Sequence, residues 1–519
     1  MALIGYLLIG LVPLSVFLIL RNVYIFIGWH DHGEAYGCKP LKIIPNSWLL
    51  PFGIDKLKKS LTAERKRKFP TLMLSDHELF GDNYGQYAGG QFIILTRDPR
   101  NISAVLSKQF ADFEYGPVRH GCFSPLLGSG IFTNDGPEWT TSRRLLAPIF
   151  HGRHLPHLET LEQHIQSFFA AIRKSMDHGS PVDLKPLIYS FTLDTATEFF
   201  LGRSTAMLSQ SEADPQNEKA RTFFKAFNTA LEYLATRERF KAFYWLVNPA
   251  EFRAACRTAR GALEDMIKDS LRSSDEIKAR SALQSIYEKM GEDLDKTRDE
   301  VYNILFAGRD SSASLLCWIF YSLARDPGVF RKLRGEVIEK LGDCSDRLVT
   351  EKDLAELTYL DNVVNETLRL FPAVPLNGRA CARTTKLPVG GGVKGEDPIH
   401  VPRGTLICYS TYALQRSEGI YGKTASQFIP ERWEEESVVA RTRDWTFHPF
   451  SGGPRKCLGE QYALKLVKYT ICRFIQQFSN IEAVNHPAGS TEDWQEKIKY
   501  QIGLTMAPDD GVWTKLTLS

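Results

Sequence analysis

The chain has 519 residues, of which 43% are hydrophobic and 24% are charged, as is ordinary for a globular protein large enough to bury a core. Its formal net charge of +3 is weak and spread along the sequence, so nothing in it demands a nucleic-acid partner. The nine cysteines are odd in number and lack CxxC pairs or zinc-ligand spacing. This pattern argues against a disulfide scaffold and a structural zinc site, and it favours reduced thiols facing the cytosol.

An apolar stretch opens the chain. Residues 2–20 contain no charged side chain, and Arg21 ends the stretch. At about 1.5 Å per residue a helix of this length spans roughly one hydrocarbon core, and Pro13 would kink it without excluding it. A cleaved signal peptide is the alternative, but the basic n-region and the small-residue cleavage site are missing.

We therefore expect residues 1–21 to be a single N-terminal membrane anchor whose C-terminal side faces the cytosol, because Arg21 is the first flanking charge. Residues 22–70 are expected to form an interfacial and linker segment, and residues 71–519 one catalytic domain. The linker carries a basic cluster from Lys56 to Lys68. That cluster is either a solvated helix surface or a contact with anionic lipid headgroups.

The remaining chain is predicted to be mostly helical. Apolar periodicity and helix-start signals predict helices at 102–107, from 136 onward, over most of the chain up to 341 including 299–323, and at 461–478. Alternating and β-branched residues predict a strand pair at 87–96 and short strands within 388–407. Residues 121–132 and 421–446 are predicted to be loops. With no repeats and no long linker, the predicted fold class is mainly α with small β-sheets.

Two of the predicted helices carry patterns that are typical of chemical sites. Trp139 and Arg143 share one helix face, where an indole N–H and a guanidinium can hold one anionic group. Gly308, Asp310 and Ser311 interrupt the long apolar helix, although glycine and serine are poor helix-interior residues. A local rule that is broken inside a core helix indicates function.

Two further patterns follow in the C-terminal half. Glu366 and Arg369 lie on one helix face and can form an ion pair, which alone would be an ordinary surface pair. Cys457 stands between glycines just before a helix, where N-terminal N–H groups would favour a thiolate. A buried structural cysteine in a glycine-rich turn is the alternative reading of that loop.

Together, and in this order over residues 136–460, these patterns resemble the motifs of the cytochrome P-450 (haem-thiolate monooxygenase) family. The haem-binding loop Phe-x-x-Gly-x-Arg-x-Cys-x-Gly is matched at every fixed place, by Phe450, Gly453, Arg455, Cys457 and Gly459. The oxygen-activation motif Ala-Gly-x-Asp-Thr-Thr is matched from Ala307, with Ser311 where Thr is usual. The ExxR motif is matched by Glu366 and Arg369, and the PERF-type motif by Arg432, with Trp433 in place of Phe.

The resemblance implies a haem b group whose iron takes the Cys457 thiolate as its axial ligand. It implies that Asp310 and Ser311 relay protons, and that the missing methyl of Ser311 leaves its rotamer freer and lowers coupling efficiency. The haem carboxylates and the loop against the haem are assigned to Trp139, Arg143, Arg379, Arg455, Phe450 and Gly459. Structural support for the cysteine loop is assigned to Glu366, Arg369 and Arg432.

The resemblance also implies partners. Electrons would come from NADPH through a separate cytochrome P-450 reductase, with cytochrome b5 as a second candidate partner. Lys456, Arg144 and Arg153 would add positive charge to the face where an acidic flavoprotein docks. Membrane lipid and a hydrophobic small-molecule substrate complete the expected partners, and the expected location is the endoplasmic reticulum membrane, single-pass, with the catalytic domain in the cytosol.

Residues 52–55, 130–136, 192–199 and 307–310 resemble the fungal and yeast microsomal branch that hydroxylates alkanes and fatty acids at the chain end. This likeness implies terminal (omega) hydroxylation of a long aliphatic chain: a fatty acid, an alkane, or the alkyl or acyl chain of a secondary metabolite, with further oxidation to aldehyde or acid. Pocket residues are expected at Phe132, Leu305 and Leu376. Gly378 stands where that branch usually has a bulkier residue, which would reshape the pocket.

Other functions stay open at this point. The enzyme could tailor a different secondary-metabolite scaffold, such as a polyketide, a terpenoid or a peptide. A haem-thiolate isomerase or dehydratase would need no O2, and the Asp310–Ser311 pair argues against it. A non-catalytic haem sensor is disfavoured by the same motif and by the anchor. A serine hydrolase is disfavoured because the G-x-S-x-G elbow is missing, and a dinucleotide domain because no G-x-G-x-x-G follows a strand and opens a helix.

Overall fold

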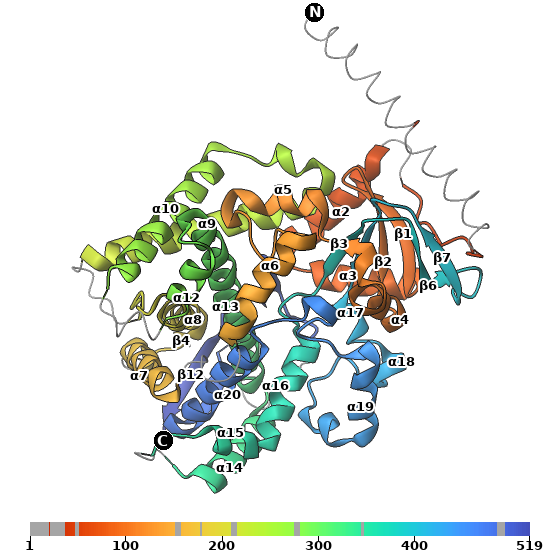
Figure 1. Cartoon of the computed structure of the whole chain (residues 1–519). Helices are drawn as coiled ribbons and strands as arrows, with labels where there is room; N and C mark the ends of the chain where they lie inside the picture. The colour runs from red at the N-terminus through yellow and green to blue at the C-terminus, as the bar shows by residue number, and fades with distance from the viewer. Residues whose placement is uncertain are drawn as a thin grey trace, which may run out of the picture.

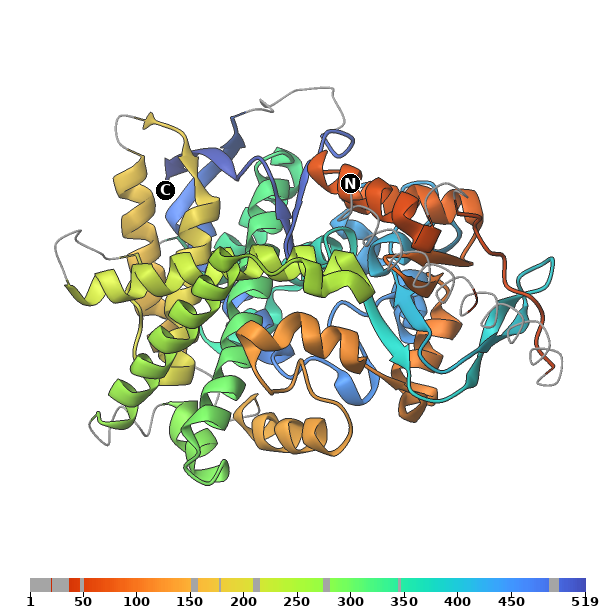
Figure 2. The same ribbon diagram turned by 90° about the horizontal axis from the view of Figure 1, so that it is seen from above.

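The computed structural model describes residues 20, 37–46, 51–150, 157–176, 179–208, 215–273, 281–343, 347–484 and 494–519. Helices make up most of this part of the chain, and the strands β1, β2, β6 and β7 lie at one side of it, whereas β4 and β12 lie among the helices (Figure 1). In Figure 1 the helices α7, α8, α9, α10 and α13 lie on the left, while β1, β2, β6 and β7 lie on the right. The view from above keeps the same two regions apart (Figure 2).

The longer helices follow the apolar periodicity of the sequence. They are α2 Ile54–Arg65, α3 Phe69–Phe80, α5 Gly116–Leu127, α6 Gly136–Leu146, α7 Leu158–Ser175, α8 Leu184–Leu201, α9 Pro215–Phe240, α10 Ala250–Leu271, α12 Ala282–Lys289, α13 Leu294–Leu323, α14 Pro327–Leu341, α16 Thr358–Leu370 and α20 Glu460–Gln477. Short α-helices are α4 Pro99–Ser103, α15 Glu351–Glu356, α17 Thr411–Leu414, α18 Glu418–Tyr421 and α19 Glu436–Arg441. The 3₁₀ and π turns are η1 Pro51–Gly53, η2 Ala104–Lys108, η3 Phe110–Asp112, η4 Ala147–Phe150, η7 Lys241–Leu246, η8 Pro430–Glu434, η9 Thr442–Thr446 and η10 Gly453–Arg455.

The strands form four small sheets. The largest has the order β1-β2-β8-β5-β3, with β1 Asn83–Ala88, β2 Gln91–Thr96, β3 Phe113–Glu114, β5 Asn377–Cys381 and β8 Leu406–Tyr409. Only β2 and β8 run parallel among its pairs. The others are β4-β12-β9, β6-β7 and β10-β11, with β4 Val182–Asp183, β6 Thr385–Gly391, β7 Asp397–Val401, β9 Phe478–Ala483, β10 Tyr500–Ile502, β11 Met506–Pro508 and β12 Trp513–Leu518.

Helix α13 forms the centre of the core. From Val301 to Leu323 nearly every side chain is buried, so the helix has no solvent face over that length. Its start is capped by Asp293, whose side chain accepts a hydrogen bond from the Lys296 N–H at 3.1 Å. The Trp318 ring stacks on Phe371 after α16, at 4.2 Å between centroids and 7° between planes. This packing ties the central helix to the segment that follows the Glu366–Arg369 pair.

The structure corrects three of the predicted segments. Residues 121–132 are not all loop, because α5 reaches Leu127. Its Cys122, Leu126 and Leu127 are completely buried, and that burial outweighs the low helix propensity of Gly121 and Pro125. Helix α13 begins five residues before the predicted start at 299. The predicted loop 421–446 contains η8, α19 and η9.

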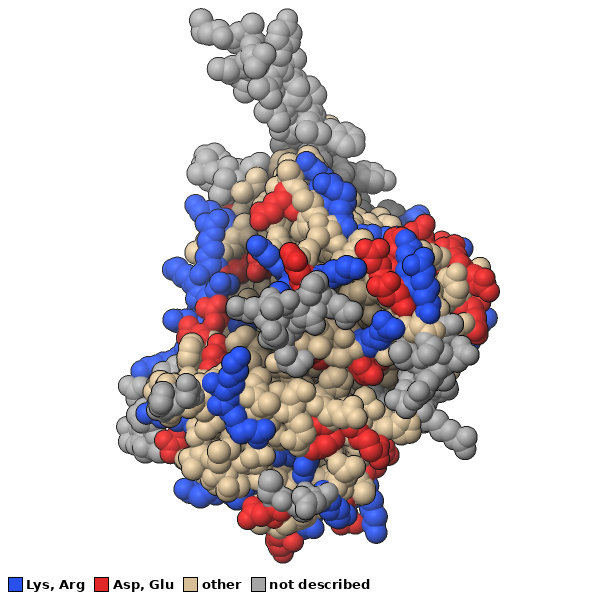
Figure 3. Space-filling model, turned by 90° about the vertical axis from the view of Figure 1, so that its left-hand side faces the viewer, with Lys and Arg blue, Asp and Glu red and all other residues tan. Residues whose placement is uncertain are grey.

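The predicted anchor, residues 1–21, lies outside the described residues apart from Leu20, and so does all of the segment 22–36. Within the part that the structure describes, no helix combines the length and hydropathy needed to cross a membrane. The basic cluster falls on α2 and its connection to α3, and α2 is packed into the fold through an ion pair of Glu64 with Arg239 of α9. On the face shown in Figure 3, acidic and basic side chains are interspersed.

Candidate active site

A cavity of about 670 Å³ lies between the large sheet, α6, α13 and the loop before α20. Most of the residues that the sequence analysis singled out border it: Phe132, Trp139, Arg143, Ser311, Leu376, Arg379, Phe450, Arg455, Cys457 and Gly459. The fold therefore brings these residues together from four separate segments of the chain. Asp310, Leu305 and the trio Glu366, Arg369 and Arg432 do not border the cavity.

The loop that carries Cys457 is held by its own backbone and by close packing. The Cys457 N–H donates to the Phe450 carbonyl at 2.9 Å, and the Ala463 N–H donates to Gly459. Gly453 has a φ of 65°, and a Cβ there would lie 1.8 Å from the Leu106 carbonyl oxygen of η2. Only glycine fits this position, because backbone atoms cannot yield as a flexible side chain would.

Cys457 is an exposed cysteine whose exposure is to the cavity that it lines. Burial of the thiol among the surrounding protein atoms raises its pKa. The Gly459 N–H and the cations Arg143 and Lys456 only partly oppose this effect. Helix α20 begins at Glu460, and the lowering effect of the Gly459 N–H at its N-cap is in the direction that the sequence predicts for a helix start. A metal cation bound to the sulfur would favour the deprotonated form.

Several guanidinium groups converge on Tyr115 beside this loop. The Arg379 guanidinium carbon lies 4.4 Å from the centre of the Tyr115 ring, and those of Arg119 and Arg455 each lie 4.2 Å from it. Burial would raise the pKa of Tyr115, but these three arginines lower it to about 8. The potential at this end of the cavity is thus strongly positive and favours bound anions.

Hydrogen bonds to neighbouring residues hold two arginines, Arg455 and Arg143, in place beside the cysteine loop. Arg455 donates to Asp135 Oδ1 at 2.6 Å and lies 4.3 Å from the Trp139 ring. Its buried Nε has no hydrogen-bond partner among the described residues. Arg143 donates to the Lys456 carbonyl at 2.8 Å, which ties α6 directly to the cysteine loop. Trp139 and Arg143 thus share the helix face predicted for them.

Helix α13 presents one face to the cavity, through Ile304, Ala307, Gly308, Ser311 and Leu315. Ser311 Oγ donates to the Ala307 carbonyl at 2.6 Å. A Cβ on Gly308 would lie 3.3 Å from the Phe200 ring, so this glycine also allows α8 to pack closely.

Two predicted residues of α13 lie off this face. Leu305 was predicted to line the pocket, but it is completely buried in the core because it follows Ile304 onto another side of the helix. Asp310 is buried beside Arg309, 3.1 Å from its Nη1. Burial raises the pKa of Asp310, against the opposing effect of Arg309.

The carboxylate of Glu366 is the centre of a buried network. Its oxygens accept from Arg369 Nε and Nη2, both at 2.8 Å, and from Arg432 Nε at 2.9 Å. The indole N–H of Trp433 and the backbone N–H of Ile429 also donate to it, at 3.1 and 2.8 Å. Both Glu366 and Arg369 are completely buried. The network is a structural support, because none of its three charged members reaches the cavity.

Arg369 connects this network to the chain before the cysteine loop. Its Nη1 donates to the Gln415 and Ala425 carbonyls at 2.7 and 2.6 Å. The Trp433 ring, which also bonds Glu366, lies 4.6 Å from Phe447, three residues before Phe450. Trp433 is thus a fourth member of the network and more than an aromatic replacement.

Sequence reasoning missed several residues of this site. Tyr115, Arg119 and Asp135 were not singled out, because no local pattern shows that they meet Arg379 and Arg455 in space. It also missed Glu300 of α13, which is buried and accepts a hydrogen bond from Ser142 of α6, the neighbour of Arg143. Burial raises the pKa of Glu300 to about 7, against the lowering effects of Ser142 and the Ile131 N–H. The signal was an acid, next to Asp299, at the start of a long apolar run.

The cavity fits the haem that the resemblance implies. It offers one cysteine sulfur as an iron ligand and, beside it, cationic side chains with a buried donor left unpaired on Arg455. Within the described residues, no group of three or more His, Cys, Asp or Glu side chains offers an alternative metal site.

Comparisons with known proteins agree with this arrangement. The family model described as cytochrome P-450 matches residues 59–499. Cytochrome P-450 52A13 of Debaryomyces hansenii is 39% identical over 437 residues, which cover 82% of this chain and 82% of the relative. Cytochrome P-450 52A3-B of Candida maltosa is 42% identical, over 77% and 78%. Cytochrome P-450 monooxygenase alt2 of Alternaria solani is 35% identical, over 93% of each chain. All three organisms are fungi, in agreement with the branch that the sequence resembles.

Replacing Glu366 by Gln should strongly destabilise the protein. The change leaves two buried guanidinium groups without a counter-charge, which costs about 3–5 kcal/mol of unfolding free energy. Chemical denaturation of the detergent-solubilised protein measures this. Glu434, half exposed and 3.3 Å from Lys332, is the matched control, and Glu434→Gln should cost less than about 1 kcal/mol. Equal losses of unfolding free energy in the two variants would show that the Glu366 network does not stabilise the fold.

Stability should also depend on the protonation of Glu300. The pKa of its carboxyl is about 7 in the folded protein against an ordinary 4.5, so the folded state binds more protons between these values. The stabilising contribution is complete below pH 4.5 and is lost as the pH rises through 7, by about 3 kcal/mol. Glu300→Gln should remove this loss.

The measurement is the difference in melting temperature between Glu300→Gln and the unmodified protein, followed from pH 5 to pH 8. We expect the difference to grow in favour of the variant as the pH rises. Glu339→Gln, at an exposed position of α14, should follow the unmodified protein at every pH. A difference that stays constant with pH would contradict a neutral Glu300.

Proposed function

The chain belongs to the cytochrome P-450 family and is a haem-thiolate monooxygenase that uses haem b and a separate reductase, and from this membership we propose that it hydroxylates the terminal carbon of a long aliphatic chain. The chain would be a fatty acid, an alkane, or the alkyl or acyl part of a fungal secondary metabolite. The product can be oxidised further to an aldehyde or an acid. The observation that carries the proposal is the apolar wall that borders Ser311 and Cys457.

That wall is made of side chains that contribute no charge. Phe132 and Phe306 meet edge to face, at 6.2 Å between centroids, and Ile304, Val374 and Leu376 border the same space. An apolar space next to the cysteine loop excludes water and accepts a methyl end without loss of hydrogen bonds. A chain end that enters it presents its last carbons to the reacting centre.

Bound haem would supply the activation of O2 and the cleavage of an unactivated C–H bond, with the Cys457 thiolate as its axial ligand. Arg379, Arg455, Trp139 and Arg143 would hold its carboxylates, as the positive potential around Tyr115 supports. Phe450 and Gly459 would keep the loop close to the ring.

Two residues of α13 would manage protons. The Ser311 hydroxyl borders the cavity and donates its hydrogen bond to the Ala307 carbonyl. Rotation of the side chain would let the same hydroxyl donate into the cavity instead. Asp310 is the adjacent acid, and burial keeps its pKa above the ordinary range, which favours exchange of a proton. Arg309 holds Asp310 away from the cavity. Delivery through this pair would require the Asp310 side chain to leave Arg309.

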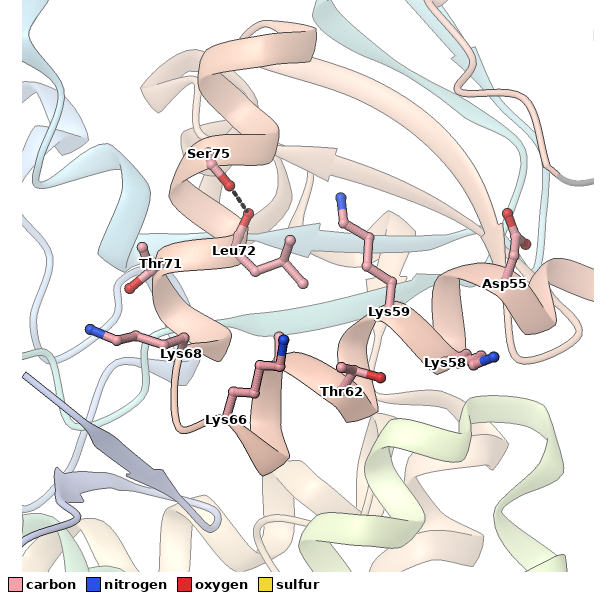
Figure 4. A pocket seen from close by; sticks show the side chains of 10 residues that line it. Asp55, Lys58, Lys59, Thr62, Lys66, Lys68, Thr71, Leu72 and Ser75 are labelled. Carbon is pink, nitrogen blue, oxygen red and sulfur yellow. Dashed lines mark hydrogen bonds between the residues drawn. The ribbon is translucent and has the colours of Figure 1, made fainter.

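For the location we propose that residues 1–21 anchor the enzyme in the endoplasmic reticulum membrane, followed by an interfacial segment to residue 70 and a cytosolic catalytic domain. Support comes from a groove between α2 and α3 that is lined by Lys58, Lys59, Lys66 and Lys68 (Figure 4). In this view the Lys59 and Lys66 side chains extend over the same hollow. Such a lysine cluster favours contact with anionic lipid.

Electron transfer would come from NADPH–cytochrome P-450 reductase, with cytochrome b5 as a further donor. Lys456 and Arg144 are exposed and would add positive charge to the face behind the cysteine loop, where an acidic flavoprotein can dock. Arg153, expected at the same face, lies outside the described residues.

The function is tested with purified full-length protein, reductase, NADPH and a panel of alkanes and fatty acids of rising chain length. We expect terminal alcohols and a reduced carbon monoxide difference band of a thiolate-ligated haem. Cys457→Ala should lose the band, while Cys472→Ala, a buried cysteine of α20, should keep it. Arg144→Glu should slow reductase-supported turnover and keep the band. Turnover of compact polycyclic substrates alone would contradict the aliphatic proposal.

The anchor is tested by placing charges in it. Leu8→Arg combined with Val16→Arg should cost roughly 5 kcal/mol or more of insertion free energy. The protein should then move from the membrane pellet to the supernatant on alkaline extraction. Leu79→Arg, at an exposed apolar position of α3, is the control and should stay in the pellet. Retention of the doubly charged variant in the pellet would contradict the anchor.

A further inference from the structure

One wall of the cavity is the face of the β1–β2 hairpin. Tyr84, Gln86, Ala88, Gln91, Ile93 and Leu95 all border the cavity, as alternation along two paired strands requires. The sheet register sets Leu95 beside Cys408, and Cys408 beside Gly378, the neighbour of Arg379. Gln91 lies four residues along β2 toward the hairpin turn, or about 13 Å away at about 3.3 Å per residue.

The hairpin turn is packed against the end of α9. A Cβ on Gly89 would lie 2.7 Å from the Phe240 carbonyl oxygen, and one on Gly90 would lie 2.7 Å from the Phe243 ring. Both glycines also have positive φ, so a residue with a side chain would be strained at either position as well as too close to these atoms. The chain around Lys241 is therefore fixed at the turn end of the cavity, away from Arg379.

This end of the cavity carries an ion pair. Lys241 Nζ donates to Glu238 Oε1 at 3.0 Å, and both side chains border the cavity. Burial opposes both charges, but each partner offsets it, so that the pKa of Glu238 is lowered and the pKa of Lys241 is raised. The pair is thus fully charged. The nearby Gln91 Oε1 is buried and has no hydrogen-bond partner among the described residues.

Arg119, which also borders the cavity, helps to lower the pKa of Glu238, although its guanidinium lies over the Tyr115 and Phe123 rings. Two other charged residues near this end are ion-paired. Arg239 forms an ion pair with Glu64, and Asp76 is bound by Lys59 at 2.7 Å. The ion-paired residues that border the cavity at this end are therefore two acids, Asp76 and Glu238, and two bases, Arg239 and Lys241. These ion-paired groups therefore leave no excess positive charge at the turn end, in contrast to the end around Tyr115, where Arg119 lies with Arg379 and Arg455.

We propose that Glu238, Lys241 and Gln91 form a head-group subsite that binds a neutral hydrogen-bonding group, a hydroxyl or a primary amide, at the far end of the aliphatic substrate. Such a group can accept from Lys241 and donate to Glu238 without breaking charge balance. A free carboxylate would approach Lys241 but would also meet the Glu238 carboxylate, and a plain alkane would leave the polar groups unpaired. This subsite rests on the proposed terminal hydroxylation, because it orients the chain with its methyl end toward Cys457.

The test uses four probes of one chain length: 1-dodecanol, dodecanamide, dodecanoate and dodecane. Dissociation constants of the full-length holoenzyme are measured by optical titration of the haem band and checked by calorimetry. The alcohol and the amide should bind more tightly than the carboxylate and the alkane. Glu238→Gln should tighten dodecanoate binding about tenfold, because Lys241 is left as an uncompensated cation. Lys241→Gln should weaken the alcohol and the amide.

Two variants of α9 serve as controls. Glu232→Gln and Lys225→Gln change the same charges at exposed positions that do not border the cavity, and they should leave all four constants unchanged. If dodecanoate binds best to the unmodified enzyme, or if Glu238→Gln leaves the ranking intact, the subsite is refuted while terminal oxidation of the probes still stands. If no probe is oxidised at its terminal carbon, the proposed function itself fails.

Discussion

Five donors that share the single carboxylate of Glu366 are the constraint on which the rest of the site depends. Three of the donors belong to two guanidinium groups, so the buried network carries one more positive than negative charge. The backbone carbonyls of Gln415, Ala425 and Gln427 accept hydrogen bonds from Arg369 and so stabilise the excess positive charge. The irregular segment from Gln415 to Gln427 is thereby fixed to α16. This attachment also fixes the position of the cysteine loop that follows the segment in the chain. Without this order the sulfur and the arginines would have no common geometry.

The two ends of the cavity differ in charge, and that difference organises its use. Near the cysteine loop, three arginines around Tyr115 create an excess of positive potential that suits a group with several carboxylates. At the hairpin turn, the pair of Glu238 and Lys241 is balanced. Between them lie aromatic and aliphatic walls. A single cavity can therefore hold an anionic cofactor at one end and a long, weakly polar substrate along the rest, without competition between them for the same cations.

The sequence was most informative where chemistry is local. The motif residues Arg143 and Glu366 lie on helices, as predicted, because i to i+3 and i+4 spacing settles which side chains share a helix face. It was least informative where partners come from distant segments. Leu305 and Ile304 differ by one position, and only the packing of α13 decides which of them meets the cavity. The same holds for α5, whose helix exists because its apolar side is buried, against its own composition.

The parallel pairing of β2 with β8 has a consequence for how the protein is made. Ile93 pairs with Leu406, a strand synthesised roughly three hundred residues later, so this contact has very high sequence separation. The hairpin can therefore acquire its neighbour strand only after most of the chain has left the ribosome. Until then its free edge and the apolar wall beside it stay open to wrong partners. The cavity is thus among the last features to close during synthesis.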